Sequence, residues 1–308
     1  MKIAVLMDPL AQLTLKKDTT LALIRYAESF GAEVMCFTPD DWYCREGEAF
    51  AQMSVIQAGQ AVLKGEFPLK SVDVILMRQN PPVDSQYLYA SFALELAEQS
   101  GVLVSNRPQS VRDTNEKFGV MQFSQCMPPT LLSQDRQRLR AFWEVHHDVV
   151  FKPLNAMGGH SVCRVDEVGS NLVVILDLIT HGGTQTIMAQ RYIPEIVTAG
   201  DRRILMIHGE PVPYVLARHP AAGDWRGNLA AGATGEVLPL TDSEKALCKQ
   251  VSPFLKAKGL HFVGLDVIGE FITEMNVTSP TCLVEITEAS GLDIAGMYWE
   301  GIKRLLKI

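Results

Sequence analysis

Residues 262–280 have the sequence FVGLDVIGEFITEMNVTSP, in which acidic side chains interrupt an otherwise apolar stretch. The pattern predicts a β-hairpin with a three-residue turn at residues 269–271. In that register Asp266 lies opposite Glu274, and Asn276 shares the face of Glu274 because strand side chains alternate. Three oxygen-bearing side chains then converge at a position where a core strand does not usually carry them.

Two facing carboxylates repel each other unless a cation lies between them. Magnesium prefers hard oxygen ligands and is commonly held by one or two carboxylates together with substrate phosphates. The sequence therefore indicates a metal site at Asp266, Glu274 and Asn276. Spacing alone leaves a second interpretation open, in which a solvent-facing hairpin carries ordinary acids.

The first hundred residues alternate between short apolar runs and helical stretches. The predicted strands are 2–7, 33–38, 73–78 and 102–105, and the predicted helices are 18–31 and 84–100. Each helix begins at an aspartate, which is a favourable N-cap, and ends near a glycine. This alternation predicts an N-terminal α/β domain at residues 1–113, with a parallel sheet flanked by helices.

The pattern changes after Pro108, where helical stretches mix with strands that we expect to be antiparallel. The predicted helices are 116–125, 136–146, 244–258 and 294–306, and the predicted strands outside the hairpin are 149–154, 161–165, 186–192, 202–208 and 212–217. Residues 223–235 are rich in glycine, alanine and polar residues and have no periodic apolar face. We expect a surface loop there that moves.

Composition excludes several classes of protein. The chain has 308 residues, is 47% apolar and carries a net charge of −7 without a basic stripe, which disfavours disorder and nucleic-acid binding. The six cysteines are scattered and form no CxxC pair, so we expect reduced thiols and a cytoplasmic protein. The apolar run at the N-terminus is too short for a signal peptide or a membrane span, and no membrane partner is expected.

Two lysines are candidate phosphate ligands. Lys152 ends a predicted strand just before Met157, Gly158 and Gly159, whose backbone amides can approach an anion closely. Lys117 lies near the start of a predicted helix. Either lysine alone is as readily an exposed surface residue. Neither GxxxxGK[ST] nor GxGxxG occurs, which disfavours Walker-type ATPases and Rossmann dehydrogenases.

Further candidates are weaker on sequence grounds. Residues 188–193, MAQRYI, end a predicted strand whose backbone groups suit an adenine edge, although an ordinary edge strand fits as well. Arg202, Arg203 and Arg226 are candidate anion ligands, and Arg226 lies in the glycine-rich loop. The sequence contains no HExxH pair and no GxSxG motif, so zinc hydrolases and serine hydrolases have no support.

These motifs together resemble the prokaryotic glutathione synthetase family of the ATP-grasp superfamily, over nearly the whole chain. The blocks that carry the resemblance are VLMDPLAQLTLKKDTT, DVILMRQNPPVD, NRPQSVRDTNEK, FKPLNAMGGHSV, MAQRYIPEI, RGNLAAG and GLDVIGEFITEMNVTSPTCLVEI. The acidic and asparagine ligands of the last block are general to ATP-grasp enzymes, whereas NVTSPT is typical of this family.

The resemblance implies a three-part fold, in which the N-terminal domain packs on two α+β ATP-grasp subdomains that hold ATP between their sheets. The subdomains are expected at 114–192 and 193–308, the second with a lid loop at 219–235. The implied ligands of ATP are Lys117 and Lys152 at the phosphates, Gly158 and Gly159 in the covering loop, Gln190, Tyr192 and Ile193 at adenine, and Asp201 at ribose. Asp266, Glu274 and Asn276 are expected to hold two Mg²⁺ ions, which Mn²⁺ can replace.

The resemblance also implies the reaction and the remaining site residues. The expected catalytic residues are Arg203 and Arg226, and Lys17, Arg78 and Ser279 are expected near the substrates. A carboxylate of γ-glutamylcysteine would attack the γ-phosphate of ATP, and glycine would then attack the acyl-phosphate to give glutathione. A homo-oligomer, either a dimer or a tetramer, is expected. The alternatives are an ATP-grasp ligase with other substrates and a non-catalytic nucleotide-binding protein.

The sequence departs from the family pattern at a few positions. Gln79 and Asn80 replace the usual lysine and aspartate, and Thr234 replaces a basic residue of the lid. We expect these changes to affect substrate affinity and lid behaviour, while the ATP and metal positions are intact.

Overall fold

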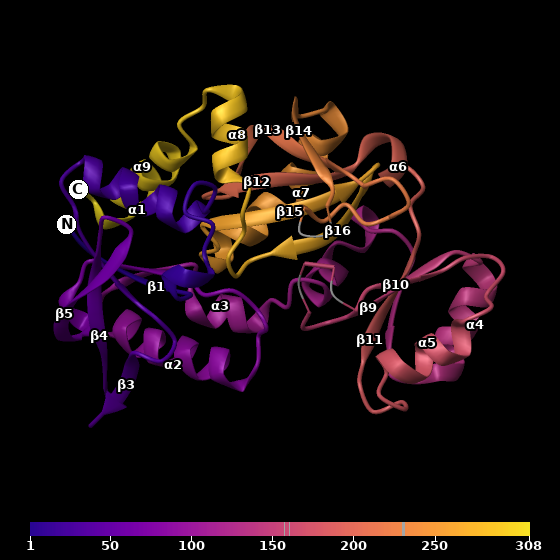
Figure 1. Cartoon of the computed structure of the whole chain (residues 1–308), viewed down its shortest axis with the longest axis horizontal. Helices are drawn as coiled ribbons and strands as arrows, with labels where there is room; N and C mark the ends of the chain where they lie inside the picture. The colour runs from indigo at the N-terminus through magenta and orange to yellow at the C-terminus, as the bar shows by residue number, and fades with distance from the viewer. Residues whose placement is uncertain (157, 160, 230–231) are drawn as a thin grey trace.

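The computed structural model describes residues 1–156, 158–159, 161–229 and 232–308. Met157 of the predicted phosphate loop and residues 230–231 of the predicted lid lie outside the described residues. The described chain forms three β-sheets with their helices, and the second sheet stands apart from the other two on the right of Figure 1. Within the described residues, none of the helices combines the length and the apolar character needed to cross a bilayer.

The first sheet has seven strands in the order β3-β4-β2-β1-β6-β7, with β5 paired to β4. The strands are β1 (Lys2–Met7), β2 (Glu33–Phe37), β3 (Trp42–Arg45), β4 (Glu48–Gln57), β5 (Gln60–Pro68), β6 (Val74–Arg78) and β7 (Leu103–Ser105). The parallel pairing of β2, β1, β6 and β7 is confirmed. Strands β3, β4 and β5 extend the sheet in antiparallel pairing and were not predicted, because they lack the continuous apolar run of a fully buried strand.

Helices α1 (Thr19–Ser29), α2 (Ser85–Gln99) and α3 (Pro108–Asp113) accompany this sheet. The predicted caps of the first two are confirmed, since the side chain of Asp18 accepts a hydrogen bond from the Leu21 amide and that of Asp84 accepts one from the Tyr87 amide. Each cap satisfies an amide that the first helical turn leaves without a partner.

The second sheet has the antiparallel order β10-β9-β11-β8. Its strands are β8 (Thr130–Ser133), β9 (Val149–Pro153), β10 (Cys163–Val165) and β11 (Ile187–Arg191), and its helices are α4 (Arg136–His146) and α5 (Leu172–Ile179). The helices and strands share a separate small core around Leu139, Phe151 and Leu176. The predicted helix at 116–125 is instead the 3-10 segment η3 (Phe118–Cys126), because Phe123 has a non-helical backbone that breaks it.

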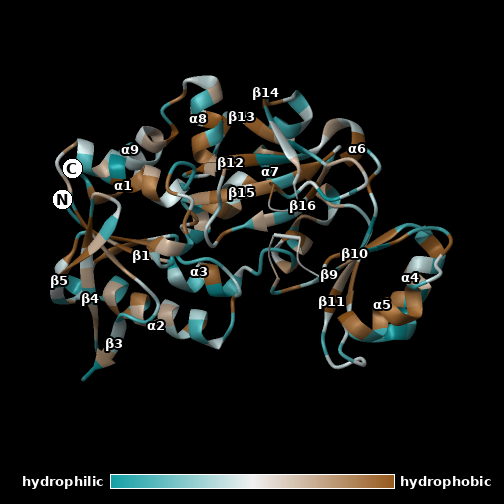
Figure 2. Ribbon diagram, viewed as in Figure 1, coloured by the Kyte–Doolittle hydropathy of each residue, from teal (hydrophilic) through white to brown (hydrophobic). Residues whose placement is uncertain are grey.

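The third sheet has the antiparallel order β14-β13-β12-β15-β16. Its strands are β12 (Asp201–Ile207), β13 (Glu210–His219), β14 (Thr234–Pro239), β15 (Phe262–Ile268) and β16 (Phe271–Asn276), and its helices are α6 (Ile196–Ala199), α7 (Asp242–Lys258), α8 (Leu283–Ser290) and α9 (Ile294–Leu306). This sheet shares two apolar cores with the first sheet, so those two parts pack as one unit. Figure 2 shows apolar residues along β12, β13 and β15.

The hairpin of residues 262–280 has the predicted register with a different turn. Its turn contains two residues, Gly269 and Glu270, and Ile268 pairs with Phe271. A bulge on β16 then restores the pairing of Asp266 with Glu274. The prediction of a three-residue turn is wrong, but the pairing is confirmed, because one extra residue in a bulge shifts the register as one extra residue in a turn does.

Asn106 joins the first sheet's domain to this hairpin. Its amide nitrogen donates to the carbonyls of Phe262 and Val277, at 2.8 and 2.7 Å, and its oxygen accepts from the Phe262 amide at 2.8 Å. The side chain is buried, and it satisfies three backbone groups at the open end of the hairpin.

We predict that Asn106→Ala lowers the free energy of unfolding by roughly 3 kcal/mol, since buried backbone groups lose their partners. Asn106→Asp keeps the acceptor but loses the donor, and it should be destabilised as well. Denaturant unfolding measures both, with Asn171→Ala as the control because Asn171 is exposed and makes no side-chain cap bond. Wild-type stability in both Asn106 variants would contradict this role.

A histidine pair lies between β12, β15 and α9. His208 Nδ1 is 3.3 Å from His261 Nδ1, and His208 Nε2 is 2.8 Å from the Tyr298 carbonyl oxygen. Burial lowers the pKa of both histidines, that of His261 to about 4. A histidine of the unfolded chain has a pKa of about 6.5, whereas folded His261 stays neutral down to about pH 4. The contribution of His261 to the free energy of unfolding is therefore complete above about pH 6.5 and is lost as the pH falls toward 4.

We therefore predict that His261 accounts for about 2 kcal/mol of the loss in unfolding free energy between pH 7 and pH 4.5. His261→Gln should show a shallower pH dependence than the wild type in urea unfolding. Equal slopes for the two proteins would show that His261 does not titrate in this way.

Candidate nucleotide and metal site

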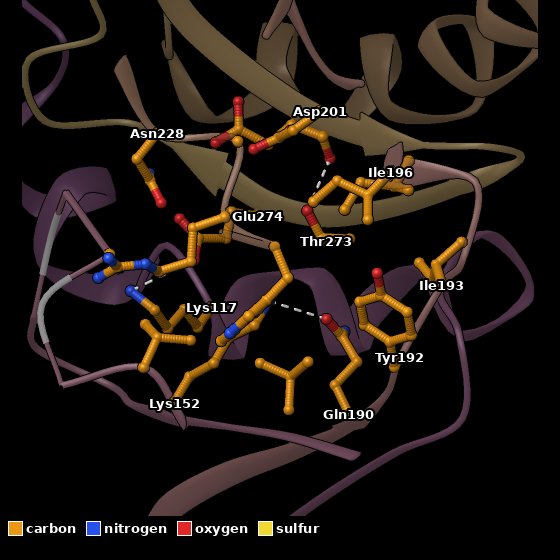
Figure 3. A pocket seen from close by; sticks show the side chains of 18 of the residues that line it. Lys117, Lys152, Gln190, Tyr192, Ile193, Ile196, Asp201, Asn228, Thr273 and Glu274 are labelled. Atoms are coloured by element: carbon orange, nitrogen blue, oxygen red, sulfur yellow. Dashed lines mark hydrogen bonds and ion pairs between the residues drawn. The ribbon is translucent and has the colours of Figure 1, made fainter. Parts of the chain in front are cut away.

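A pocket lies between the second and third sheets. The second sheet contributes Lys152 and Gln190, and the third contributes Asp266 and Glu274. Figure 3 shows Asn228 and Glu274 near the lysines, whereas Tyr192, Ile193 and Ile196 lie at the opposite end. The pocket therefore has one charged end and one apolar end, as a site for a ligand with an anionic and a flat apolar part requires.

The two lysines of the charged end come from different parts of the chain. Lys117 Nζ donates to the Ala156 carbonyl at 2.7 Å and lies 3.5 Å from Glu274 Oε1. Lys152 Nζ donates to Gln190 Oε1 at 2.9 Å, and within the described residues it has no carboxylate partner within 4.0 Å. Burial lowers the pKa of Lys152. A half-buried ammonium group with no carboxylate in direct contact can bind an anionic ligand.

Asp266 lines the pocket from the third sheet and contacts three other side chains of that sheet. Arg203 donates to both of its carboxylate oxygens, and Arg218 Nη2 lies 3.0 Å from Asp266 Oδ1 and 2.7 Å from Asp201 Oδ2. Asn276 Nδ2 donates to Asp266 Oδ2 at 3.1 Å. Although burial opposes ionisation, the two guanidinium groups hold the pKa of Asp266 well below its usual range.

The predicted metal ligands share one face of the hairpin. Asp266 and Glu274 pair directly, and Asn276 is bonded to Asp266. No group of three His, Cys, Asp or Glu side chains suited to a metal occurs among the residues that the structure describes. Two carboxylates and one amide oxygen are hard donors, and they fit an Mg²⁺ ion that takes its other ligands from phosphates and water.

The loop between β13 and β14 reaches over the pocket. Arg226 Nη2 donates to Asp224 Oδ2 at 2.7 Å within this loop. A Cβ on Gly159 would lie 2.5 Å from Asn228 Oδ1, so the two loops approach each other closely at this position. Gly159 also has a φ of +77°, which favours glycine.

The structure brings most of the predicted site residues together. Those that line the pocket are Lys117, Lys152, Gly158, Gly159, Gln190, Tyr192, Ile193, Asp201, Arg226, Asp266 and Glu274. Arg203 and Asn276 do not line it but contact Asp266. The roles assigned to these residues stay predictions.

The three predicted substrate ligands lie outside this pocket. Arg78 is buried, donates to the Pro280 carbonyl at 2.7 Å and to Thr20 Oγ1 at 3.1 Å, and therefore lies near Ser279. Burial lowers the pKa of Arg78 to about 10. Lys17 is exposed at the residue before the cap of α1.

The departures from the family pattern lie in different environments. Gln79 is buried, and its Oε1 has no hydrogen-bond partner within the described residues. The Asn80 amide donates to Asp8 Oδ1 at 3.4 Å, whereas Thr234 is exposed at the start of β14.

Several residues of the site were not predicted. Arg218 pairs with Asp201 across β12 and β13, and extending the predicted hairpin by one residue would have found it. Trp225 and Asn228 lie close to Arg226 in the loop between β13 and β14, and Thr273 is the bulged residue of the hairpin. Apolar side chains such as Val150 line the pocket without any distinguishing pattern in the sequence.

Two α+β units that face each other across a pocket lined by lysines and carboxylates define the ATP-grasp class. A crystal structure of D-cycloserine synthetase DcsG matches with a TM-score of 0.73 at 12% identity, over 99% of each chain. A structure of the ATP-grasp ligase PsnB, titled as complexed with minimal precursor, Mg and ADP, matches with a TM-score of 0.63 at 16% identity, over 99% of this chain and 98% of that one.

The chain belongs to the prokaryotic glutathione synthetase family. The model of the family's N-terminal domain matches residues 1–112, and the model of its ATP-grasp domain matches residues 116–291. The glutathione synthetase of Citrobacter rodentium is 46% identical over 99% of both chains. That of Pseudomonas aeruginosa is 47% identical over 98% of this chain and 97% of its own.

We predict that Lys152→Met weakens binding of MgADP at least tenfold without loss of stability, because it removes a half-buried ammonium group that has no carboxylate partner within 4.0 Å among the described residues. Calorimetry measures the binding and thermal unfolding the stability. Lys64→Met, which removes an exposed lysine of β5, is the control and should change neither. Unchanged MgADP affinity in Lys152→Met would remove this lysine from the site.

Proposed function

We propose that the chain joins γ-glutamylcysteine and glycine in an ATP-dependent reaction that gives glutathione, ADP and phosphate. It is an ATP-dependent ligase of the family identified above. The observation that carries the proposal is the meeting of the Lys152 ammonium group from the second sheet and that of Lys117 with the Asp266 and Glu274 carboxylates from the third sheet.

The charged end of the pocket suits the phosphates of ATP. Lys117 is buried and Lys152 is half-buried, and both are point charges that can neutralise phosphate oxygens, while the glycines at 158–159 allow backbone amides to approach. Asp266, Glu274 and Asn276 would hold two Mg²⁺ ions, with Mn²⁺ able to replace them. Such ions supply charge neutralisation at the transferred phosphoryl group.

The other end of the pocket suits the nucleoside. Tyr192 and Ile193 would contact adenine at the end of β11, together with Gln190. Asp201 would bind ribose: its Oδ1 is buried and has no hydrogen-bond partner within the described residues, which a ribose hydroxyl would provide.

The chain's own residues would act by positioning and by charge. The γ-glutamylcysteine carboxylate attacks the γ-phosphate, and an acyl-phosphate forms as ADP leaves. The glycine amine then attacks the activated carbonyl, the new C–N bond forms, and phosphate is released. Arg203 and Arg226 are proposed to stabilise the negative charge of these steps, and Lys17, Arg78 and Ser279 to bind the amino-acid substrates. The loop at 219–235 would exclude water from the acyl-phosphate.

The family supports a proposal for the oligomeric state and the cellular compartment. We propose a homo-oligomer, either a dimer or a tetramer, that acts in the cytoplasm. The six cysteines, which are all free in the described chain, suit a reducing compartment. Light scattering of the purified protein tests the oligomeric state.

The decisive experiment measures phosphate release from ATP with γ-glutamylcysteine and glycine, each omitted in turn. We expect release at the full rate only with both substrates, and glutathione as the product by mass spectrometry. Release that needs neither substrate would contradict the proposal. Turnover with another acid and amine would instead favour a ligase of different specificity.

Glu274→Gln tests the metal site within the same assay. It preserves the shape of the side chain but removes a carboxylate, so we expect phosphate release to fall at least a hundredfold while the fold and the unfolding temperature are retained. Normal turnover in this variant would discard Glu274 as a metal ligand. Glu236→Gln, an exposed acid on β14, is the matched control.

A further inference from the structure

Trp225 belongs to an apolar group that consists entirely of pocket residues. Val150, Tyr192 and Ile196 form the buried part of this group, and Trp225 packs against it from the lid. Every member, including the partly buried Val162 and Ile268, also lines the pocket. Trp225 is not a member of the three larger cores of the described chain. The apolar residues that Trp225 packs against in this group therefore form part of the wall of the pocket.

Tyr192 and Trp225 together form an aromatic wall of the pocket, and contacts with Arg164 hold Tyr192 in place. The Arg164 guanidinium carbon lies 3.5 Å from the centroid of the Tyr192 ring, and Asp148 accepts two hydrogen bonds from Arg164, at 2.8 and 2.6 Å. The rings of Tyr192 and Trp225 meet edge to face, with centroids 6.5 Å apart and planes at 79°. Tyr192 is thus fixed, and Trp225 approaches it from a loop.

Asp224 ties the position of Trp225 to that of Arg226. Its Oδ1 accepts from the Trp225 amide at 2.7 Å and from the Arg226 amide at 3.0 Å. The side chains of these two neighbours reach different ends of the pocket: Trp225 meets Tyr192, whereas Arg226 lies near Gly159 at the phosphate loop. One short turn therefore links the apolar end of the pocket to its charged end.

We infer that Trp225 is a specificity-determining residue, whose indole ring closes the apolar end of the pocket over a flat heteroaromatic base. The lid then closes on the base and on the phosphate chain together, so a triphosphate without a suitable base does not order it. This inference rests on the proposed function, because it takes the ligand of the pocket to be a nucleotide. It adds a residue of the lid to those assigned to the base.

Tryptophan fluorescence tests the inference without any amino-acid substrate. We expect MgATP to change the fluorescence emission of the wild type. It should also change the emission of Trp143→Phe, which is the control because Trp143 lies on α4 and does not line the pocket. The change should be lost in Trp225→Phe, although this variant should bind MgATP within about threefold of the wild type, since a ring remains. Magnesium tripolyphosphate, which has no base, should leave the emission of all three proteins unchanged.

Trp225→Ala supplies the second test. Loss of a ring that contacts a base should raise the Kd for MgATP roughly tenfold and leave the Kd for magnesium tripolyphosphate unchanged, so the preference for ATP over tripolyphosphate should fall by a similar factor. A residue that only supports the loop would weaken both ligands equally. Turnover, where it is measured, should show the effect in the KM for ATP, with kcat within about threefold of the wild type.

Three results would overturn the inference: an emission change in Trp225→Phe, an equal response to tripolyphosphate, or an unaltered ATP preference in Trp225→Ala. Failure of the proposed function is distinguishable from these. If MgATP changes the Trp225 emission but γ-glutamylcysteine and glycine are not joined, the role of Trp225 stands and the substrate assignment falls.

Discussion

Asp266 is the buried charge on which the site depends. Four adjacent strands each bring one side chain to this cluster: Arg218 from β13, Arg203 from β12, Asp266 from β15 and Asn276 from β16. An isolated carboxylate at this depth would be very costly, and two guanidinium groups offset that cost. The order and register of the third sheet are thereby linked to the chemistry of the pocket.

Side chains of opposite charge, Lys152 and Glu274, line the pocket from different sheets. The third sheet shares its cores with the first sheet, whereas the second sheet has a small core of its own. Lys152 is fixed by the second sheet, and Glu274 by the third. The loop that carries Trp225 and Arg226 reaches both ends of the pocket, since Trp225 meets Tyr192 and Arg226 lies near Gly159.

Sequence reasoning was most successful where a local pattern has one physical solution. The helix caps at Asp18 and Asp84 and the pairing of Asp266 with Glu274 are of this kind. It failed where several conformations satisfy the same pattern: a two-residue turn with a bulge replaced a three-residue turn, and a 3-10 segment at 118–126 replaced the helix predicted at 116–125. Strands β3, β4 and β5 were missed because partly exposed strands at the edge of a sheet lack a continuous apolar run.

The sequence by itself determined the parallel strands of the first sheet, the carboxylate hairpin and the family, since these depend on local periodicity and on motifs of fixed spacing. Only the tertiary structure decided that Arg218 shares Asp266 with Arg203, that Lys152 is half-buried without a carboxylate partner in the described chain, and that Trp225 meets Tyr192. These contacts join residues that are far apart in the chain. Their energies depend on burial and distance, which no local pattern of residues specifies.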